Sequence, residues 1–205
     1  MAETIVRGAL ANLDFAAYAY PSDDGQAGVR MAERPYATRV SLRGDPADRG
    51  FMANAGRVLD LVLPTEAGAT AAGGSVTALW LGPDEWLLLS AEGDSGLAER
   101  LDDALAGLAA TAVEVTEGAT MIRLAGPRAR DVLAKGCPLD LHPRVFGAGR
   151  VAQSVIAQAD AILHQTADDG GDGPAFEIHV RRSFAEYLWL WLADAAREYG
   201  VDVDR

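Results

Sequence analysis

The sequence contains a single cysteine, Cys137, among its 205 residues. One thiol cannot form an intrachain disulfide, which excludes the disulfide frameworks of small secreted domains. Basic residues are also scarce, because 18 Lys and Arg stand against 30 Asp and Glu and give a net charge of −12. A phosphate backbone or an anionic membrane surface would repel such a chain. We therefore expect neither nucleic acid nor a membrane as a partner.

Long hydrophobic runs are absent as well. The longest notable one, Tyr187–Ala193, is about a third of the length that a membrane-spanning helix needs. Residues 1–20 contain Glu3 and Asp14 and lack a basic stretch followed by an apolar run, so they do not look like a signal peptide. The sequence therefore predicts a cytoplasmic protein.

The usual nucleotide-binding motifs are missing too. The Gly-x-Gly-x-x-Gly pattern of dinucleotide-binding folds does not occur, and Gly147-Ala148-Gly149 has no third glycine at the required position. A lysine-containing phosphate loop is also absent. We therefore expect no flavin or nicotinamide site of the usual kind in this chain, and the sequence identifies no cofactor-binding residue.

Few side chains are candidates for chemistry. His142, His164 and His179 lack the spacing of metal ligands, so we expect no metal site. Cys137 is either a nucleophile, which requires a base close to it, or a small buried thiol just past a helix end, and we favour the buried thiol. Asp60, flanked by leucines, is either a half-buried carboxylate that binds a ligand amine or an exposed strand residue. We assign no catalytic residue.

The chain divides into an N-terminal arm and one ordered domain. Residues 1–34 show weak periodicity and contain a turn-like stretch of proline, aspartate and glycine at 21–25, so we predict an arm there. Alternating apolar and polar residues over 36–43 then predict a strand, with a short helix after it. The runs at 76–81 and 85–90 predict a β-hairpin, because a proline-containing turn joins them.

The second half of the domain repeats the first. Val40–Ala47 and Ile122–Ala129 share leucine, glycine and alanine at an offset of 82 residues, and both halves read strand, helix, further strands, helix. An internal duplication explains this order. We therefore predict an α+β fold in which residues 35–205 form a single duplicated domain, with halves at about 36–116 and 120–200, mostly antiparallel sheets and flanking helices.

The last predicted helix has the clearest pattern. Ser183 and Glu186 form a capping box at its start, and Gly200 ends it. Its predicted core stripe consists of apolar residues at helical spacing: Phe184, Tyr187, Leu188, Trp191, Leu192, Ala195 and Tyr199. Trp189 and Leu190 fall outside this stripe. Either a loop or the arm covers them within the chain, or another subunit does, and they are our candidate subunit interface because tryptophan is enriched at interface hot spots.

Three segments resemble the sarcosine oxidase gamma subunit family. They are Ala78–Leu87, Leu124–Cys137 with its continuation through Asp140–Pro143, and Arg182–Trp189, and their order and spacing match as well. The resemblance covers roughly residues 36–200. This family is similar in fold to the folate-binding domain of the glycine-cleavage aminomethyltransferase, which is itself an internal duplication and so agrees with the repeat.

The resemblance implies a heterotetrameric complex with alpha, beta and delta subunits. That complex oxidises sarcosine to glycine, produces hydrogen peroxide and forms 5,10-methylenetetrahydrofolate. The resemblance places FAD and covalent FMN mainly in beta, NAD and tetrahydrofolate in alpha, zinc in delta, and no catalytic residue in gamma. We therefore expect a non-catalytic structural subunit of an oxidoreductase complex. The alternative is a free-standing folate or one-carbon binding protein of the same fold, for which Asp60 is the only suggested ligand.

Overall fold

The fold is described by a computed structural model, in which two compact units are distinguished. The described residues are 8–21, 26–34, 38–90, 93–168 and 171–204. The five-stranded unit comprises Ala37–Thr116 and Ala148–Gln153, and the six-stranded unit comprises Met1–Tyr36, Glu117–Gly147 and Ser154–Arg205.

The main division between the units lies at Thr116/Glu117, close to the boundary that we expected between the two halves. The common origin of those halves stays a prediction. Most of the turn predicted at 21–25, and the domain start expected at residue 35, lie outside the described residues.

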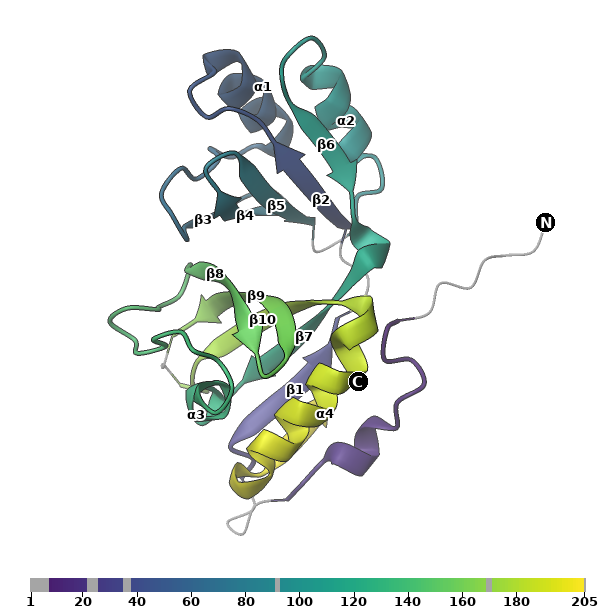
Figure 1. Cartoon of the computed structure of the whole chain (residues 1–205), viewed down its shortest axis with the longest axis vertical. Coiled ribbons are helices and arrows are strands. Elements are labelled where there is room, and N and C mark those ends of the chain that lie inside the picture. The colour runs from purple at the N-terminus through teal and green to yellow at the C-terminus, as the bar shows by residue number, and fades with distance from the viewer. Residues whose placement is uncertain (1–7, 22–25, 35–37, 91–92, 169–170, 205) are drawn as a thin grey trace, which may run out of the picture. The chain divides into compact units, whose positions relative to one another are not determined.

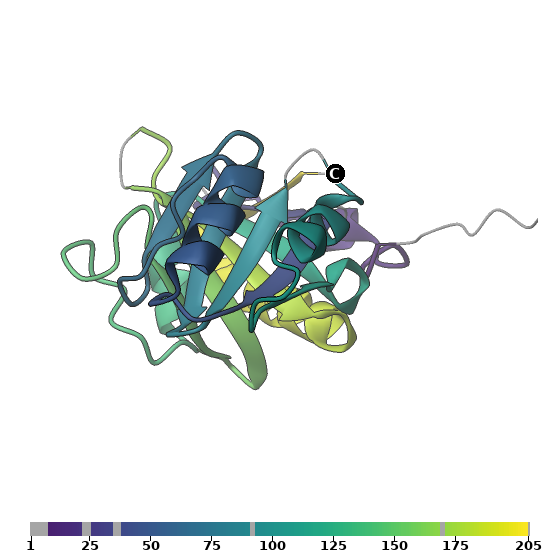
Figure 2. The same ribbon diagram turned by 90° about the horizontal axis from the view of Figure 1, so that it is seen from above.

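The five-stranded unit is a sheet with both of its helices on one face. Its elements are β2 (Thr38–Arg43), α1 (Arg49–Leu59), β3 (Thr70–Gly73), β4 (Val76–Gly82), β5 (Glu85–Ser90), α2 (Leu97–Ala104) and β6 (Thr111–Glu114). The strand order is β3-β4-β5-β2-β6, and all four neighbouring pairs are antiparallel. The two helices share one hydrophobic core with the sheet and lie beside each other (Figures 1 and 2).

Helix α1 shows how the sequence builds this core. The carboxylate of Asp48 accepts hydrogen bonds from the backbone N–H groups of Gly50 (2.7 Å) and Phe51 (3.2 Å), which would otherwise have no acceptor in the first turn. Phe51, Ala55 and Leu59 recur every four residues and therefore share one face of the helix. All three are buried in the core.

The predicted β-hairpin is confirmed as β4 and β5, whose tryptophans Trp80 and Trp86 pair across the two strands. Trp86 is completely buried, and its indole N–H donates a hydrogen bond to the backbone oxygen of Pro64 at 2.7 Å. Its ring lies 5.7 Å from the ring of Phe51, measured between centroids. The hairpin thus supplies the aromatic centre of the core beneath α1.

The six-stranded unit contains most of the remaining elements. They are η1 (Phe15–Tyr18), β1 (Val29–Glu33), β7 (Ala119–Ala125), α3 (Ala129–Ala134), β8 (Val151–Ile156), β9 (Ala159–Ala167), β10 (Ala175–Arg181), η3 (Arg182–Phe184), α4 (Ala185–Ala196), η4 (Arg197–Tyr199) and β11 (Val201–Asp204). A short turn, η2 (Thr116–Gly118), precedes β7. The strand order is β11-β1-β7-β10-β9-β8.

The arm predicted over residues 1–34 is wrong for its last part, because residues 29–33 form strand β1. This strand lies inside the sheet, antiparallel to β7 and parallel to β11. Val29 and Met31 are fully buried. The five residues of β1 are too few to show a clear period, and their place is fixed by partners that lie far away in the sequence.

The two units share one strand order. The order β3-β4-β5-β2-β6 corresponds to β8-β9-β10-β7-β11, with β1 inserted between β7 and β11. Gly44 and Gly126, which we aligned in the repeat, directly follow the corresponding strands β2 and β7. The predicted α+β class with mostly antiparallel sheets is confirmed.

Candidate functional site

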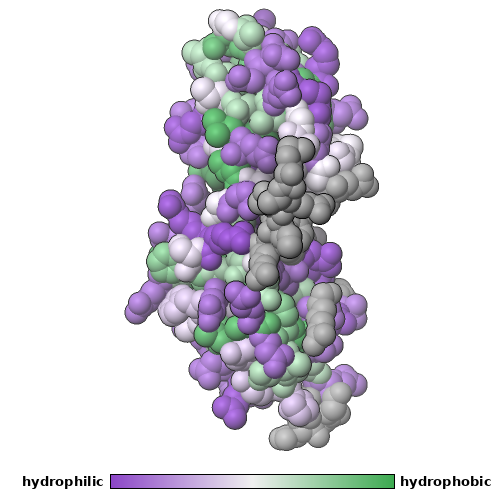
Figure 3. All heavy atoms as spheres, turned by 90° about the vertical axis from the view of Figure 1, so that its right-hand side faces the viewer, coloured by the Kyte–Doolittle hydropathy of each residue, from purple (hydrophilic) through white to green (hydrophobic). Residues whose placement is uncertain are grey.

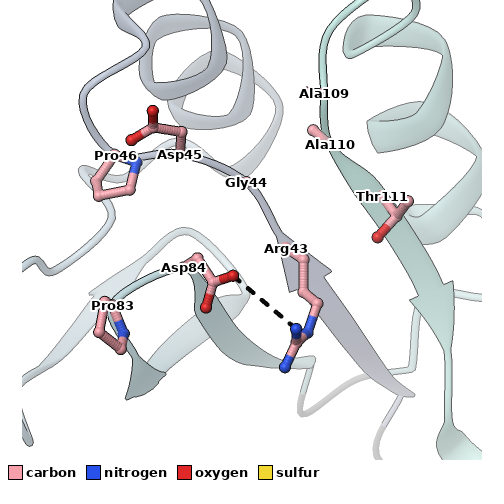
Figure 4. Close-up of a pocket in the computed structure, with 9 residues that line it drawn as sticks. All are labelled: Arg43, Gly44, Asp45, Pro46, Pro83, Asp84, Ala109, Ala110 and Thr111. Atoms are coloured by element: carbon pink, nitrogen blue, oxygen red, sulfur yellow. Dashed lines mark ion pairs between the residues drawn. The ribbon is translucent and has the colours of Figure 1, made fainter.

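An open depression lies in the five-stranded unit, where β2, the β4–β5 turn and the segment before β6 meet (Figure 4). Its volume is about 550 Å³, and it is lined by Arg43, Gly44, Asp45, Pro46, Pro83, Asp84, Ala109, Ala110 and Thr111. Arg43 is paired with Asp84 at 3.9 Å and with Glu85 at 2.5 Å. The lining residues include no histidine, cysteine or serine, and Thr111 has the only hydroxyl group among them.

A charged cluster lies on one face of the six-stranded sheet. Glu177 of β10 is the register partner of His164 on β9 and of Arg123 on β7. The Glu177 carboxylate lies 3.3 Å from Nδ1 of His164 and 3.9 Å from Nε2 of His179, and both histidines are buried. Sequence reasoning missed Glu177, although period two places it on the same face of the strand as His179.

Opposing effects act on the pKa of Glu177. Burial raises this pKa, but the hydrogen bond with His164 and the charges of His179, His164 and Arg123 together outweigh burial and leave it below its ordinary value of 4.5. His142 lies apart from the cluster, exposed in the loop after α3. Within the described ranges, no group of three or more His, Cys, Asp and Glu side chains is arranged to hold a metal ion.

The lowered pKa of Glu177 predicts a pH-dependent contribution to stability. A carboxylate whose pKa is lower in the folded than in the unfolded state stabilises the fold above the unfolded pKa and loses this effect as pH falls through the folded one. Glu177→Gln is therefore expected to cost about 1 kcal/mol at pH 7 and progressively less below about pH 4.5. Urea denaturation at several pH values measures this, with the exposed Glu99→Gln as control. A cost for Glu177→Gln that is the same at pH 7 and pH 3 would contradict the prediction.

Cys137 directly follows Gly136, which makes a close packing contact between the end of α3 and α4. Its thiol is buried, and its sulfur lies 4.0 Å from the hydroxyl oxygen of Ser154. A Cβ added to the preceding Gly136 would come within 2.5 Å of the Trp191 ring, so only glycine allows this close approach. These contacts agree with the interpretation of Cys137 as a packed thiol.

Lys135 completes this contact by joining α3 to the end of α4. Its ammonium group donates a hydrogen bond to the backbone oxygen of Ala195 at 2.5 Å, forms an ion pair with Glu198 and lies 4.6 Å from the centre of the Tyr199 ring. The hydrogen bond with Glu198 raises the pKa of Lys135. The Lys-Gly-Cys segment is therefore explained by packing.

Asp60 does not fit either of its two interpretations. It is exposed, and it caps the C-terminal end of α1 in the left-handed conformation, with φ of 53°. It is neither a half-buried ligand carboxylate nor a strand residue. Aspartate tolerates this conformation better than most residues, so a helix cap accounts for its position.

Helix α4 begins differently from the prediction. The helix starts at Ala185, after the 3-10 turn η3 that contains Ser183, and no side chain caps it. The capping box is therefore wrong, because the chain enters the helix through a tighter turn. Gly200 does end the helical segment, with φ of 77°.

The buried face of α4 also differs from the predicted stripe. Its buried residues are Ala185, Leu188, Trp189, Leu192, Ala193 and Ala196. Phe184 and Tyr187, which we expected in the core, are 43% and 38% exposed. The helix is therefore rotated so that Trp189 points inward. Period alone did not fix its orientation, because apolar residues occur on more than one side.

The two candidate interface residues lie in different surroundings. Trp189 is fully buried, and its ring meets the ring of Phe15 in η1 edge to face, with centroids 4.8 Å apart. The N-terminal segment thus covers Trp189, as in the first of the two arrangements that we considered. Figure 1 shows this segment beside α4. Leu190 is half-buried, and its contact with another subunit stays a prediction.

The described surface shows few apolar side chains. On the face drawn in Figure 3, hydrophobic residues reach the surface in separate areas among hydrophilic ones. Besides Phe184 of η3 and Tyr187 of α4, the large exposed hydrophobic residues among those described are valines: Val62, Val113, Val115, Val145 and Val155. Among the described residues, no helix combines the length and the apolar character that crossing a membrane requires.

Chains with the same fold occur among solved structures, and two of them bear directly on this protein. A chain of the heterotetrameric sarcosine oxidase from Corynebacterium sp. U-96, in complex with pyrrole 2-carboxylate, matches with a TM-score of 0.84 and 31% identity, over 96% of this chain and 97% of that chain. The glycine cleavage system aminomethyltransferase T from Bartonella henselae matches with a TM-score of 0.70 and 14% identity, over 98% of this chain and 59% of that chain. The second likeness is one of fold alone.

Sequence comparison identifies relatives that match most of this chain. Sarcosine oxidase subunit gamma from an Arthrobacter species is 37% identical over 172 residues, which are 83% of this chain and 81% of that protein. Its counterpart from Corynebacterium sp. strain P-1 is 36% identical over 175 residues, or 85% and 83% of the two chains. Residues 43–198 match the sequence pattern of the family described as "Sarcosine oxidase, gamma subunit family". The chain therefore belongs to the sarcosine oxidase gamma subunit family.

Proposed function

We propose that this chain is the gamma subunit of a cytoplasmic heterotetrameric sarcosine oxidase, assembled with alpha, beta and delta subunits. The observation that carries the proposal is the match, over nearly the full length of both chains, to a chain of such an oxidase. The whole complex oxidises sarcosine to glycine, produces hydrogen peroxide and forms 5,10-methylenetetrahydrofolate. FAD, FMN, NAD, tetrahydrofolate and zinc belong to the other subunits in this arrangement.

The role of this chain in the complex is structural. The side chains that were candidates for chemistry make internal contacts: the Cys137 thiol meets Ser154, and His164 and His179 meet Glu177. Asp60 caps a helix. These contacts support a subunit that shapes and stabilises an assembly rather than one that binds the reacting atoms.

Co-purification tests the proposal. The chain is co-expressed with the alpha, beta and delta subunits encoded in the same genome, with an affinity tag on alpha. We expect one copy of this chain per complex, and we expect omission of its gene to lower the yield of active enzyme. A chain that stays outside the complex would refute the proposal. Calorimetric titration of the isolated chain with tetrahydrofolate addresses the alternative, because tight binding without the other subunits would favour a free-standing folate-binding protein.

A further inference from the structure

Helix α4 has apolar side chains on two faces. Only Glu186 and Asp194 are charged among its twelve residues. One face is buried under the rest of the unit and includes Trp189, which Phe15 covers. A helix that is apolar nearly all round is typical of one that is covered on more than one side.

The outer face of α4 carries an aromatic stripe. At about 100° per residue, Tyr187 and Trp191 fall within roughly 40° of each other on α4, and Phe184 is the last residue of η3, directly before the helix. Phe184 and Tyr187 are among the exposed large hydrophobic residues, and Trp191 is half-buried where it lies over Gly136. A single exposed aromatic residue needs no explanation, but three in one stripe mark a surface that another molecule covers.

Acidic residues lie along one side of this stripe. Glu186 and Asp194 are both exposed, and half-buried Leu190 lies between them on the helix surface. An aromatic centre with a charged border is the usual composition of a protein interface. Because the whole chain has a net charge of −12, a second copy would place acidic residues against acidic residues, which disfavours self-association through this face.

We propose that the outer face of α4, formed by Tyr187, Trp191 and the border residues Glu186 and Asp194, docks this chain onto another subunit of the complex together with Phe184 of η3, which directly precedes the helix. The partner surface is an apolar groove bordered by lysine or arginine, which accepts the helix lengthwise. This inference rests on the proposed function and names the surface that performs it. The proposed interface no longer includes Trp189, which lies on the opposite side of the same helix.

Competition between two gamma chains tests this surface within the complete complex. Wild-type chain and a variant, distinguished by different epitope tags, are co-expressed with the other subunits. Their ratio in the purified complex is divided by their ratio in the soluble lysate, which corrects for differences in folding. The variants are Phe184→Ser/Tyr187→Gln, which removes the aromatic centre, and Glu186→Lys/Asp194→Lys, which reverses the border charge. The control is Val145→Ser, at an exposed residue of the same unit, 57% accessible and outside α4.

We expect each double variant to be disfavoured by about thirtyfold, the effect of losing one interface hot spot. Val145→Ser should enter the complex as readily as wild type. Incorporation of the Phe184→Ser/Tyr187→Gln variant at the wild-type ratio would overturn the inference, and so would wild-type incorporation of the charge-reversed variant. Absence of the wild-type chain itself from the complex is a different outcome, because it would refute the proposed function.

Discussion

Replacing Trp189 by alanine is expected to lower the free energy of unfolding by about 3–5 kcal/mol, the range for large aromatic residues in a core. The indole is fully buried and packs edge to face on Phe15, so its removal leaves a cavity beneath the N-terminal segment. For a chain of this length the melting temperature should fall by roughly 6–20 °C. Thermal unfolding of the full chain, followed by circular dichroism, measures the effect.

Two further variants sharpen this experiment. The indole N–H of Trp189 is buried without a hydrogen-bond acceptor among the described residues. Trp189→Phe keeps a ring against Phe15 and removes that donor, so it should retain most of the stability. Phe15→Ala should lower the melting temperature by less than Trp189→Ala, because Phe15 is itself only half-buried. An unchanged melting temperature for Trp189→Ala, together with its loss from the complex, would instead assign the indole to the subunit interface.

Replacing Gly126 by alanine is expected to destabilise the six-stranded unit by about 2–6 kcal/mol. Gly126 has φ of 127°, which strains any residue with a Cβ and costs about 1–3 kcal/mol. The added Cβ would also lie 2.6 Å from the backbone oxygen of Gly28 and 3.0 Å from Cα of Val29, at the start of β1. Backbone atoms of a central strand cannot move aside easily, so overpacking adds about 1–3 kcal/mol more.

A matched glycine provides the control for this second prediction. A Cβ at Gly118 would meet nothing within 4 Å, and Gly118 has no positive φ. Gly118→Ala should therefore leave stability unchanged or raise it by about 0.4–1 kcal/mol, because alanine restricts the unfolded chain. Urea denaturation compares the two variants under the same conditions. Equal midpoints for Gly126→Ala and Gly118→Ala would show that the corner after β7 does not need glycine.

Local patterns predicted the elements whose partners are near in sequence. The β4–β5 hairpin needs only a short turn and two apolar runs, so both of its strands were predicted correctly. The short helix expected after the strand at 36–43 is α1, which has a single apolar stripe. The family resemblance rested on the same kind of continuous segment and is confirmed.

The incorrect predictions concern elements whose position or orientation depends on contacts with residues far away in the sequence. Strand β1 is recognisable only from its pairing with β7 and β11, which come much later in the chain. The orientation of α4 depends on Phe15, and no periodicity within the helix reveals a ring near the other end of the sequence. Because α4 has apolar residues on two faces, its sequence allowed two orientations, and the predicted stripe corresponds largely to the outer one. For this reason the subunit interface that we first assigned to Trp189 is now proposed on the other face of the helix.

The insertion of β1 between β7 and β11 also determines the order in which the chain can acquire its structure during synthesis. Residues 38–116 of the five-stranded unit are continuous and form its complete sheet, so this sheet has all of its strands before residues 117–204 have been translated. Strand β1 is made before any of them, yet both of its neighbours are translated later. Its backbone N–H and C=O groups therefore have no strand partners until β7 and β11 have been translated. A nascent strand with exposed edges is prone to aggregate. Strand β1 is therefore translated before the other strands of both sheets and is among the last to be protected.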